Sequence, residues 1–158
     1  MYDDLPYDIS LEVVVEASTL DVDALRNLAV RVMAGEDIEA GTCLAILMVG
    51  DDEIREMNHQ FLGIDEPTDV LSFPDEADDF VQGLSEDRLL GDIAISLPTA
   101  TRQAAAVGHS LDAELAHLLT HGILHLCGYD HVDNPVEEAR MRAREEHYLG
   151  DLGVVHSH

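Results

Sequence analysis

The chain has 158 residues, 46% of them apolar, which is enough for one domain with a sizeable core. Its 33 acidic residues outnumber 8 basic ones, all of them arginine, and give a formal charge of −25. A nucleic-acid binder usually shows the opposite balance, so a long-range electrostatic attraction to RNA or DNA is excluded.

Strands and helices are predicted to alternate from the start of the chain. Residues 9–16 alternate in polarity and then run in β-branched residues, which predicts a first strand. Asp21 or Asp23 can cap the helix that follows, and Gly35 is expected to end it. The apolar run at 42–50 has strand length and predicts a buried central strand.

The middle of the chain is predicted to contain a helix, a short strand and a loop. Residues 51–63 begin with acids that suit the positive end of a helix dipole. Pro67 stops further helix, and residues 69–73 predict a short strand before Pro74. The acidic stretch at 75–88 has no consistent apolar period, so we expect a mobile loop that could serve as a flap.

The second half begins with a fourth strand at 89–97, after which Pro98 opens a helix. Ser110 or Asp112 starts a long apolar helix, and residues 135–149 predict a last one. The predicted fold is of the α+β class, with a small sheet of about four strands packed with about five helices. We expect a single domain over 1–158, with a loose tail at about 151–158.

A histidine motif, HGILHLCGYDH, occupies residues 121–131. Histidines four apart share one helix face, so His121 and His125 can offer ring nitrogens to one ion. Gly128 can end the helix in a left-handed turn and bring His131 back toward the pair. Three imidazoles with one open position predict a catalytic zinc site, although nickel, copper or cobalt would fit the same donors.

This spacing equals that of the metzincin proteases, HExxHxxGxxH, except that Gly122 replaces their glutamate. In those proteases the glutamate is the general base, and glycine cannot take its role. Peptide hydrolysis by that route is therefore not expected.

The motif and two upstream segments resemble the YbeY family of metal-dependent endoribonucleases. Residues 66–74, EPTDVLSFP, are similar to the family's PT(D/N)VLSFP segment, and residues 90–95, LGDIAI, to its LGDI strand. The resemblance covers roughly residues 10–150. It implies a mixed sheet and an enzyme that cleaves single-stranded RNA in ribosomal RNA maturation and ribosome quality control.

The resemblance also implies the partners, namely a ribosomal RNA precursor and ribosomal proteins, with no DNA. One position departs from the family, because Leu62 stands where many members carry an arginine suited to contact phosphate. The acidic charge has two interpretations: adaptation to high salt, or delivery of the RNA by a partner or the ribosome.

A bound zinc ion would lower the pKa of its water to ~7 and polarise a phosphoryl oxygen. Hydrolysis and attack by the ribose 2′-hydroxyl are both open. Asp92 and Asp130 are the candidate catalytic acids, since Asp92 lies in the LGDI match and Asp130 adjoins His131. Ser72 is a candidate for lining the cleft. Each of the three has a structural alternative, which for Ser72 is a local hydrogen bond.

Several polar residues are interpreted as structural. Cys43 and Cys127 are expected to be reduced core thiols, with ligation by Cys127 the less favoured alternative. His117 is interpreted as lining the cleft rather than as a fourth ligand. The last predicted helix carries Arg140, Arg142 and Arg144. These arginines are interpreted as an exposed face with i, i+4 ion pairs rather than as phosphate contacts.

Two other classes of function remain open. The protein could be a zinc hydrolase of a peptide or small phosphoester, or a ribosome-associated binding module with a structural metal. No apolar run approaches the ~18 residues that cross a bilayer, and the first ten residues are acidic where a signal peptide would be basic. We therefore expect a cytoplasmic protein that makes no membrane contact.

Overall fold

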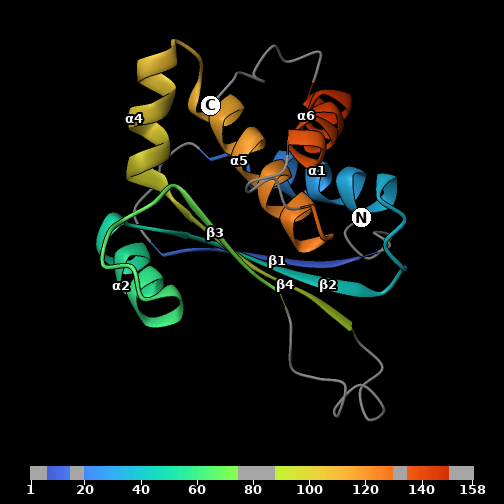
Figure 1. The fold of residues 1–158 in the computed structure, drawn as a ribbon, viewed down its shortest axis with the longest axis horizontal. Coiled ribbons are helices and arrows are strands. Elements are labelled where there is room, and N and C mark those ends of the chain that lie inside the picture. Colours follow the sequence, from blue (N-terminus) through green and yellow to red (C-terminus); the bar gives the residue numbers. More distant parts are fainter. Residues whose placement is uncertain (1–6, 15–19, 75–87, 130–134, 150–158) are drawn as a thin grey trace.

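The computed structural model describes residues 7–14, 20–74, 88–129 and 135–149. One four-stranded sheet lies at its centre, with the strand order β1-β2-β4-β3 (Figure 1). The strands are β1 (Asp8–Val13), β2 (Thr42–Val49), β3 (Val70–Pro74) and β4 (Arg88–Ser96). Strands β1, β2 and β4 are parallel, and β3 runs antiparallel along one edge. The predicted mixed sheet is confirmed.

Five helices cover the sheet within the described ranges, in agreement with the predicted number. They are α1 (Val22–Gly35), α2 (Asp51–Leu62), α4 (Leu97–Val107), α5 (Leu111–Leu126) and α6 (Pro135–Leu149). Helix α2 lies against one face of the sheet, whereas α1, α5 and α6 lie on the other (Figure 1). Helix α5 is the central one, because it packs on α1, α4, α6 and the two strands β3 and β4.

The two faces of β4 are both buried, and they belong to different parts of the core. Ile93 and Ile95 pack in the large cluster with α5, where Leu119 and Ile123 are fully buried. Ala94 packs in a smaller cluster on the α2 side. Because side chains alternate along a strand, the face of β4 on which each residue lies is fixed by this pattern.

The ends of the helices follow the predicted turn chemistry. Asp21 and Ser110 are N-caps whose side chains accept hydrogen bonds from Ala24 N and Ala113 N. Helix α1 ends at Gly35 as predicted, but Gly35 is not the left-handed residue of the turn that follows. The left-handed residue is Asp37, at φ 63°. Gly35 is needed because a Cβ there would overlap the phenol ring of Tyr148.

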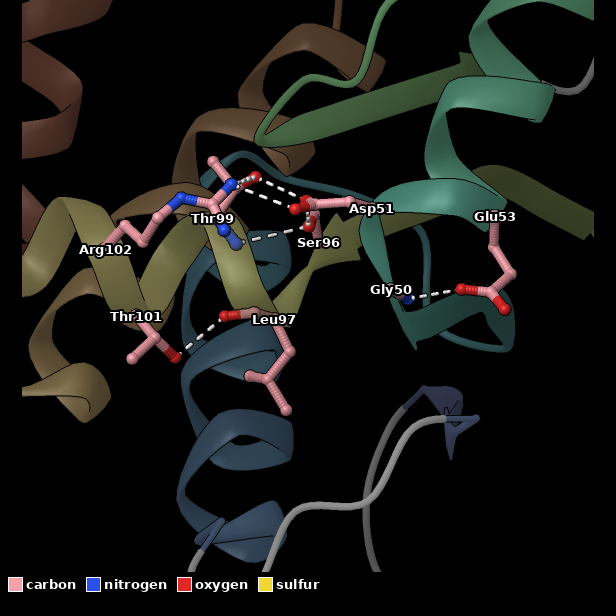
Figure 2. A network of polar contacts seen from close by, with 8 residues as sticks. All are labelled: Gly50, Asp51, Glu53, Ser96, Leu97, Thr99, Thr101 and Arg102. Carbon is pink, nitrogen blue, oxygen red and sulfur yellow. Dashed lines mark hydrogen bonds and ion pairs between the residues drawn. The ribbon is translucent and has the colours of Figure 1, made fainter.

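A polar cluster joins the start of α2 to the start of α4, at the carboxyl ends of β2 and β4 (Figure 2). The Asp51 carboxylate accepts hydrogen bonds from the hydroxyls of Ser96 (2.6 Å) and Thr99 (2.7 Å), and from Arg102 (2.9 Å). These bonds, from Ser96 first, hold the pKa of Asp51 below its usual range. The cluster fixes α4, and α4 in turn packs on α5.

Two expectations concern parts of the chain that are largely beyond the described ranges. The predicted acidic loop lies outside the described residues, except that Arg88 begins β4. The predicted tail at 151–158 lies outside them entirely. Within the described ranges, every helix is too short or too polar to cross a membrane.

Candidate metal centre

Helix α5 places His121 and His125 side by side on one face. Their ring centroids are 4.7 Å apart, and the ring planes meet at 77°. Two imidazoles bound to one ion in tetrahedral geometry, with metal–nitrogen bonds of ~2.0 Å, would hold their centroids about 5 Å apart. The side chain of His121 is 27% exposed. The pair therefore suits a shared metal ion at a site that solvent can reach.

The predicted third ligand, His131, and the neighbouring Asp130 lie outside the described residues. The turn that leads toward them is described, however. Gly128 has φ 106° and donates its N–H to the His125 carbonyl at 3.0 Å, as predicted for a glycine that ends this helix. Within the described ranges, no group of three or more His, Cys, Asp or Glu side chains is arranged to hold a metal ion. The three-histidine site stays a prediction.

Gly122 faces the sheet. A Cβ at this position would lie 3.1 Å from Ile93 Cδ1 and 3.2 Å from the hydroxyl of Ser72. The glycine is buried, and it lets α5 approach β3 and β4 closely. A glutamate here would point into the packed interface between helix and sheet rather than toward the ion. The difference from the metzincin motif therefore has a packing cause.

Ser72 and Asp92 occupy different faces of the sheet. The half-buried hydroxyl of Ser72 donates to the Gly122 carbonyl at 3.3 Å, so Ser72 contacts the helix that carries the histidines. Asp92 adjoins Ile93, whose side chain meets α5, and alternation turns Asp92 toward the opposite face. This placement favours the structural alternative for Asp92, and its catalytic role stays a prediction.

Glu145 of α6 is a site residue that the sequence interpretation missed. Its Oε2 lies 2.6 Å from His121 Nδ1, and its Oε1 lies 3.7 Å from His117 Nε2. The residue is only 6% exposed. Burial opposes ionisation, but the contacts with His117 and His121 outweigh it and lower the pKa of Glu145 to about 2.

The sequence did contain a signal for Glu145. The buried residues of α6 are spaced i, i+4, i+7 and i+8, and they are Met141, Glu145, Tyr148 and Leu149. Glu145 therefore lies on the apolar stripe, where a charged residue needs a partner.

His117 is buried beside this carboxylate, at 3% exposure. It lies in the interior between packed helices. The prediction that His117 lines an open cleft is therefore wrong. Its ring centroid is 6.2 Å from that of His121, compared with 4.7 Å between His121 and His125. Glu145, which His121 also contacts, lies 3.7 Å from the Nε2 of His117.

A second cluster holds α6 in place, and Glu36 is its centre. The Glu36 carboxylate accepts hydrogen bonds from the hydroxyls of Tyr148 (2.6 Å) and Tyr129 (2.8 Å), and from Arg144 Nε (2.8 Å). Arg144 also donates to the Gly35 carbonyl at 3.3 Å. The cluster joins the end of α1, the turn after α5 and the helix that carries Glu145.

The arginines of α6 therefore divide into two groups. Arg142 lies 3.5 Å from Glu138 at the predicted i, i+4 spacing, and Arg140 lies 3.5 Å from Glu137 at i, i+3, so both have local partners. For Arg144 the prediction of a local surface ion pair is wrong, because its partner Glu36 lies 108 residues away in the sequence.

We expect Glu36→Gln to destabilise the protein at neutral pH by about 1–3 kcal/mol, since hydrogen bonds to a buried charge are lost. Burial raises the pKa of Glu36, but the bonds from Tyr148, Arg144 and Tyr129 outweigh it and lower the pKa below the usual 4.5. A lowered pKa stabilises the fold above pH 4.5, and that contribution is lost as pH falls through the folded-state value. Urea unfolding from pH 7 to 3 should show the difference from wild type shrinking.

The control is Glu56→Gln on α2, which removes the same charge from an exposed position. A Glu36→Gln protein that keeps wild-type stability at pH 7 would contradict the role of the cluster.

Cys127 forms the C-cap of α5 and is half-buried. Burial, and then the charge of Glu36, raise the pKa of the Cys127 thiol to about 11. The residue is therefore a thiol rather than a thiolate at neutral pH, which agrees with the structural interpretation. Leu62, at the position of the missing arginine, is 58% exposed at the end of α2.

Comparison of the sequence with a family model and with known proteins gives the same family name each time. The family model for "Endoribonuclease YbeY" matches residues 12–153. A Chloroflexus aurantiacus protein named "Endoribonuclease YbeY" is 46% identical over 141 residues, which cover 88% of this chain and 92% of that protein. A Roseiflexus castenholzii protein of the same name is 42% identical over 154 residues, covering 96% and 97%.

The fold is also similar to a solved structure. The solution structure of a Thermotoga maritima protein matches with a TM-score of 0.59 and 28% identity, over 92% of this chain and 91% of that one. The region that matches the family model contains the paired histidines of α5, the strands β2, β3 and β4, and the carboxylate of α6. On the extent of these matches, the chain belongs to the YbeY family of endoribonucleases.

Proposed function

We propose that this protein is a metal-dependent endoribonuclease that cleaves single-stranded RNA during ribosomal RNA maturation and ribosome quality control. His121, His125 and His131 hold one divalent ion, zinc in the first instance. The observation that carries the proposal is the pair of adjacent imidazoles on α5, one of them bonded through Nδ1 to a buried carboxylate. Family membership supplies the reaction class.

The described residues would have different roles in such a site. Helix α5 holds the rings of His121 and His125 with their centroids 4.7 Å apart, which supports their binding one ion. Its apolar residues, with those of β4, form a wall of low polarity that strengthens electrostatic interactions at the site. The ion, when bound, would supply a hydroxide at neutral pH and would stabilise charge on the phosphate. Gly122 has no side chain, so it cannot act as the general base that the metzincin glutamate provides.

The surface charge bears on how RNA reaches this site. Most described arginines are paired with carboxylates, as Arg55 is with Asp65 at 2.8 Å and Arg102 with Asp51 at 2.9 Å. With a formal charge of −25, the chain cannot draw RNA in over a distance. We propose a cytoplasmic setting in which ribosomal proteins present the precursor RNA to the site.

Removal of the metal is expected to abolish cleavage of a single-stranded precursor ribosomal RNA fragment. The protein should lose about one equivalent of metal to a chelator, lose its activity with it, and recover both when zinc is added back. Nickel and cobalt should be compared with zinc, since imidazole ligands accept all three. The assay should cover a range of salt concentrations because of the protein's charge.

Cleavage that persists at full rate after the metal has been removed would contradict the proposal. One alternative keeps an observation in its favour: the acidic surface and exposed Leu62 also suit a zinc hydrolase of a non-nucleic substrate. A metal-loaded protein that leaves the RNA intact but hydrolyses a model peptide or phosphoester would support that alternative. A binding module with a structural metal would show no exchangeable water on the ion.

A further inference from the structure

The carboxylate of Glu145 lies behind the histidine pair, on the helix α6. It approaches His121 at Nδ1, at 2.6 Å, with its second oxygen 3.7 Å from His117 Nε2. A carboxylate only accepts hydrogen bonds when ionised, so the proton of this contact belongs to Nδ1 of His121. An imidazole with its proton on Nδ1 carries its lone pair on Nε2.

We propose that Glu145 is a positioning residue of the metal centre, which fixes the tautomer and the orientation of His121 so that Nε2 binds the ion. The inference rests on the proposed metal site. It goes beyond that site because Glu145 lies on a different helix and 24 residues from His121. The negative charge beside Nδ1 also makes Nε2 a stronger donor.

Burial makes this contact specific. The Glu145 side chain is 8% exposed, so a misplaced or unpaired carboxylate would be costly there. His117 restricts the carboxylate from the side of α5 away from His125. The Glu36 cluster restricts the backbone of α6 through the neighbouring residue Arg144 and through Tyr148. The carboxylate is therefore held by contacts on both sides, independently of any ion.

Glu145→Gln is the variant that tests the inference, because it keeps the size of the side chain and removes its charge. The glutamine amide can donate to Nδ1 as well as accept from it, so it no longer holds the proton of His121 on Nδ1. We expect zinc affinity, measured by competition with a chelator, to fall 10- to 100-fold. Glu146→Gln is the matched control, since it removes the same charge from the adjacent exposed position and should bind zinc like wild type.

A second readout does not depend on the ion. Nitrogen-15 NMR of the histidine rings reports the tautomer, and wild-type His121 should be protonated at Nδ1 both with zinc and after chelation. In Glu145→Gln the proton should shift toward Nε2 in the zinc-free protein. If that variant does not fold, the wild-type tautomer still decides.

The outcomes separate this inference from the proposed function. Wild-type His121 protonated at Nε2 but not at Nδ1, or Glu145→Gln that binds zinc as tightly as wild type, would overturn the role of Glu145 alone. Wild-type protein that binds no zinc would overturn the proposed function. In that case the Nδ1 tautomer of His121 in the zinc-free protein would still support the contact with Glu145 as the device that orients the ring.

Discussion

Replacing His125 with alanine is expected to lower the rate of RNA cleavage about 10³-fold, which corresponds to ~4 kcal/mol of transition-state stabilisation. His125 shares a face of α5 with His121, at a ring separation of 4.7 Å, and its loss would leave too few donors for a catalytic ion. The side chain is half-buried near the end of the helix. The fold should therefore remain, with only a modest change in the midpoint of thermal unfolding.

The measurement is a single-turnover cleavage assay with equal zinc supplied to each protein. His59→Ala is the matched control, because His59 is an exposed histidine on α2, which lies on the other face of the sheet. The control should cleave at the wild-type rate. Equal cleavage by wild type and His125→Ala would show that the activity comes from a contaminant or from a site that does not use this histidine.

Local features of this chain could be predicted from its sequence, since they depend on neighbouring residues. The N-caps Asp21 and Ser110 have short side chains that accept backbone N–H groups, and both begin helices in the structure. Gly63 and Gly128 end their helices in the left-handed conformation that glycine tolerates. The histidine pair follows from the period of the helix alone.

Contacts between distant segments could not be predicted in the same way. Nothing in the segment around Arg144 indicates that its partner is Glu36, because the partner depends on how α6 packs against the end of α1. Glu145 is one of several glutamates in α6, and the other charged residues of this helix are at least partly exposed. Only its spacing of four residues from both Met141 and Leu149 indicates that it is buried. Alternation along β4 predicts that Asp92 and Ile93 lie on opposite faces of the sheet. It does not predict which of the two faces α5 covers, because that depends on the packing of the helices.

Gly122 is a position where sequence comparison and structure lead to opposite experiments. The metzincin motif suggests that Gly122→Glu would supply the missing general base. The structure predicts instead that this variant fails to fold stably. Its side chain would enter the interface with Ile93 and Ser72, where an unpaired carboxylate is buried. A loss of at least ~4 kcal/mol is expected, against the 5–15 kcal/mol of stability that domains usually have.

Gly122→Ala tests the packing without the charge. Alanine gains up to about 1 kcal/mol in helix propensity, but its Cβ would lie 3.1 Å from Ile93, and overpacking of that kind costs ~1–3 kcal/mol. We therefore expect a small net destabilisation for alanine and a severe one for glutamate. Urea unfolding should be compared with Ala105→Glu, an added charge at an exposed position of α4 that should leave stability unchanged. If Gly122→Glu folded with wild-type stability and cleaved peptides, position 122 would face the ion, and the packing of α5 against β3 and β4 would have to be different.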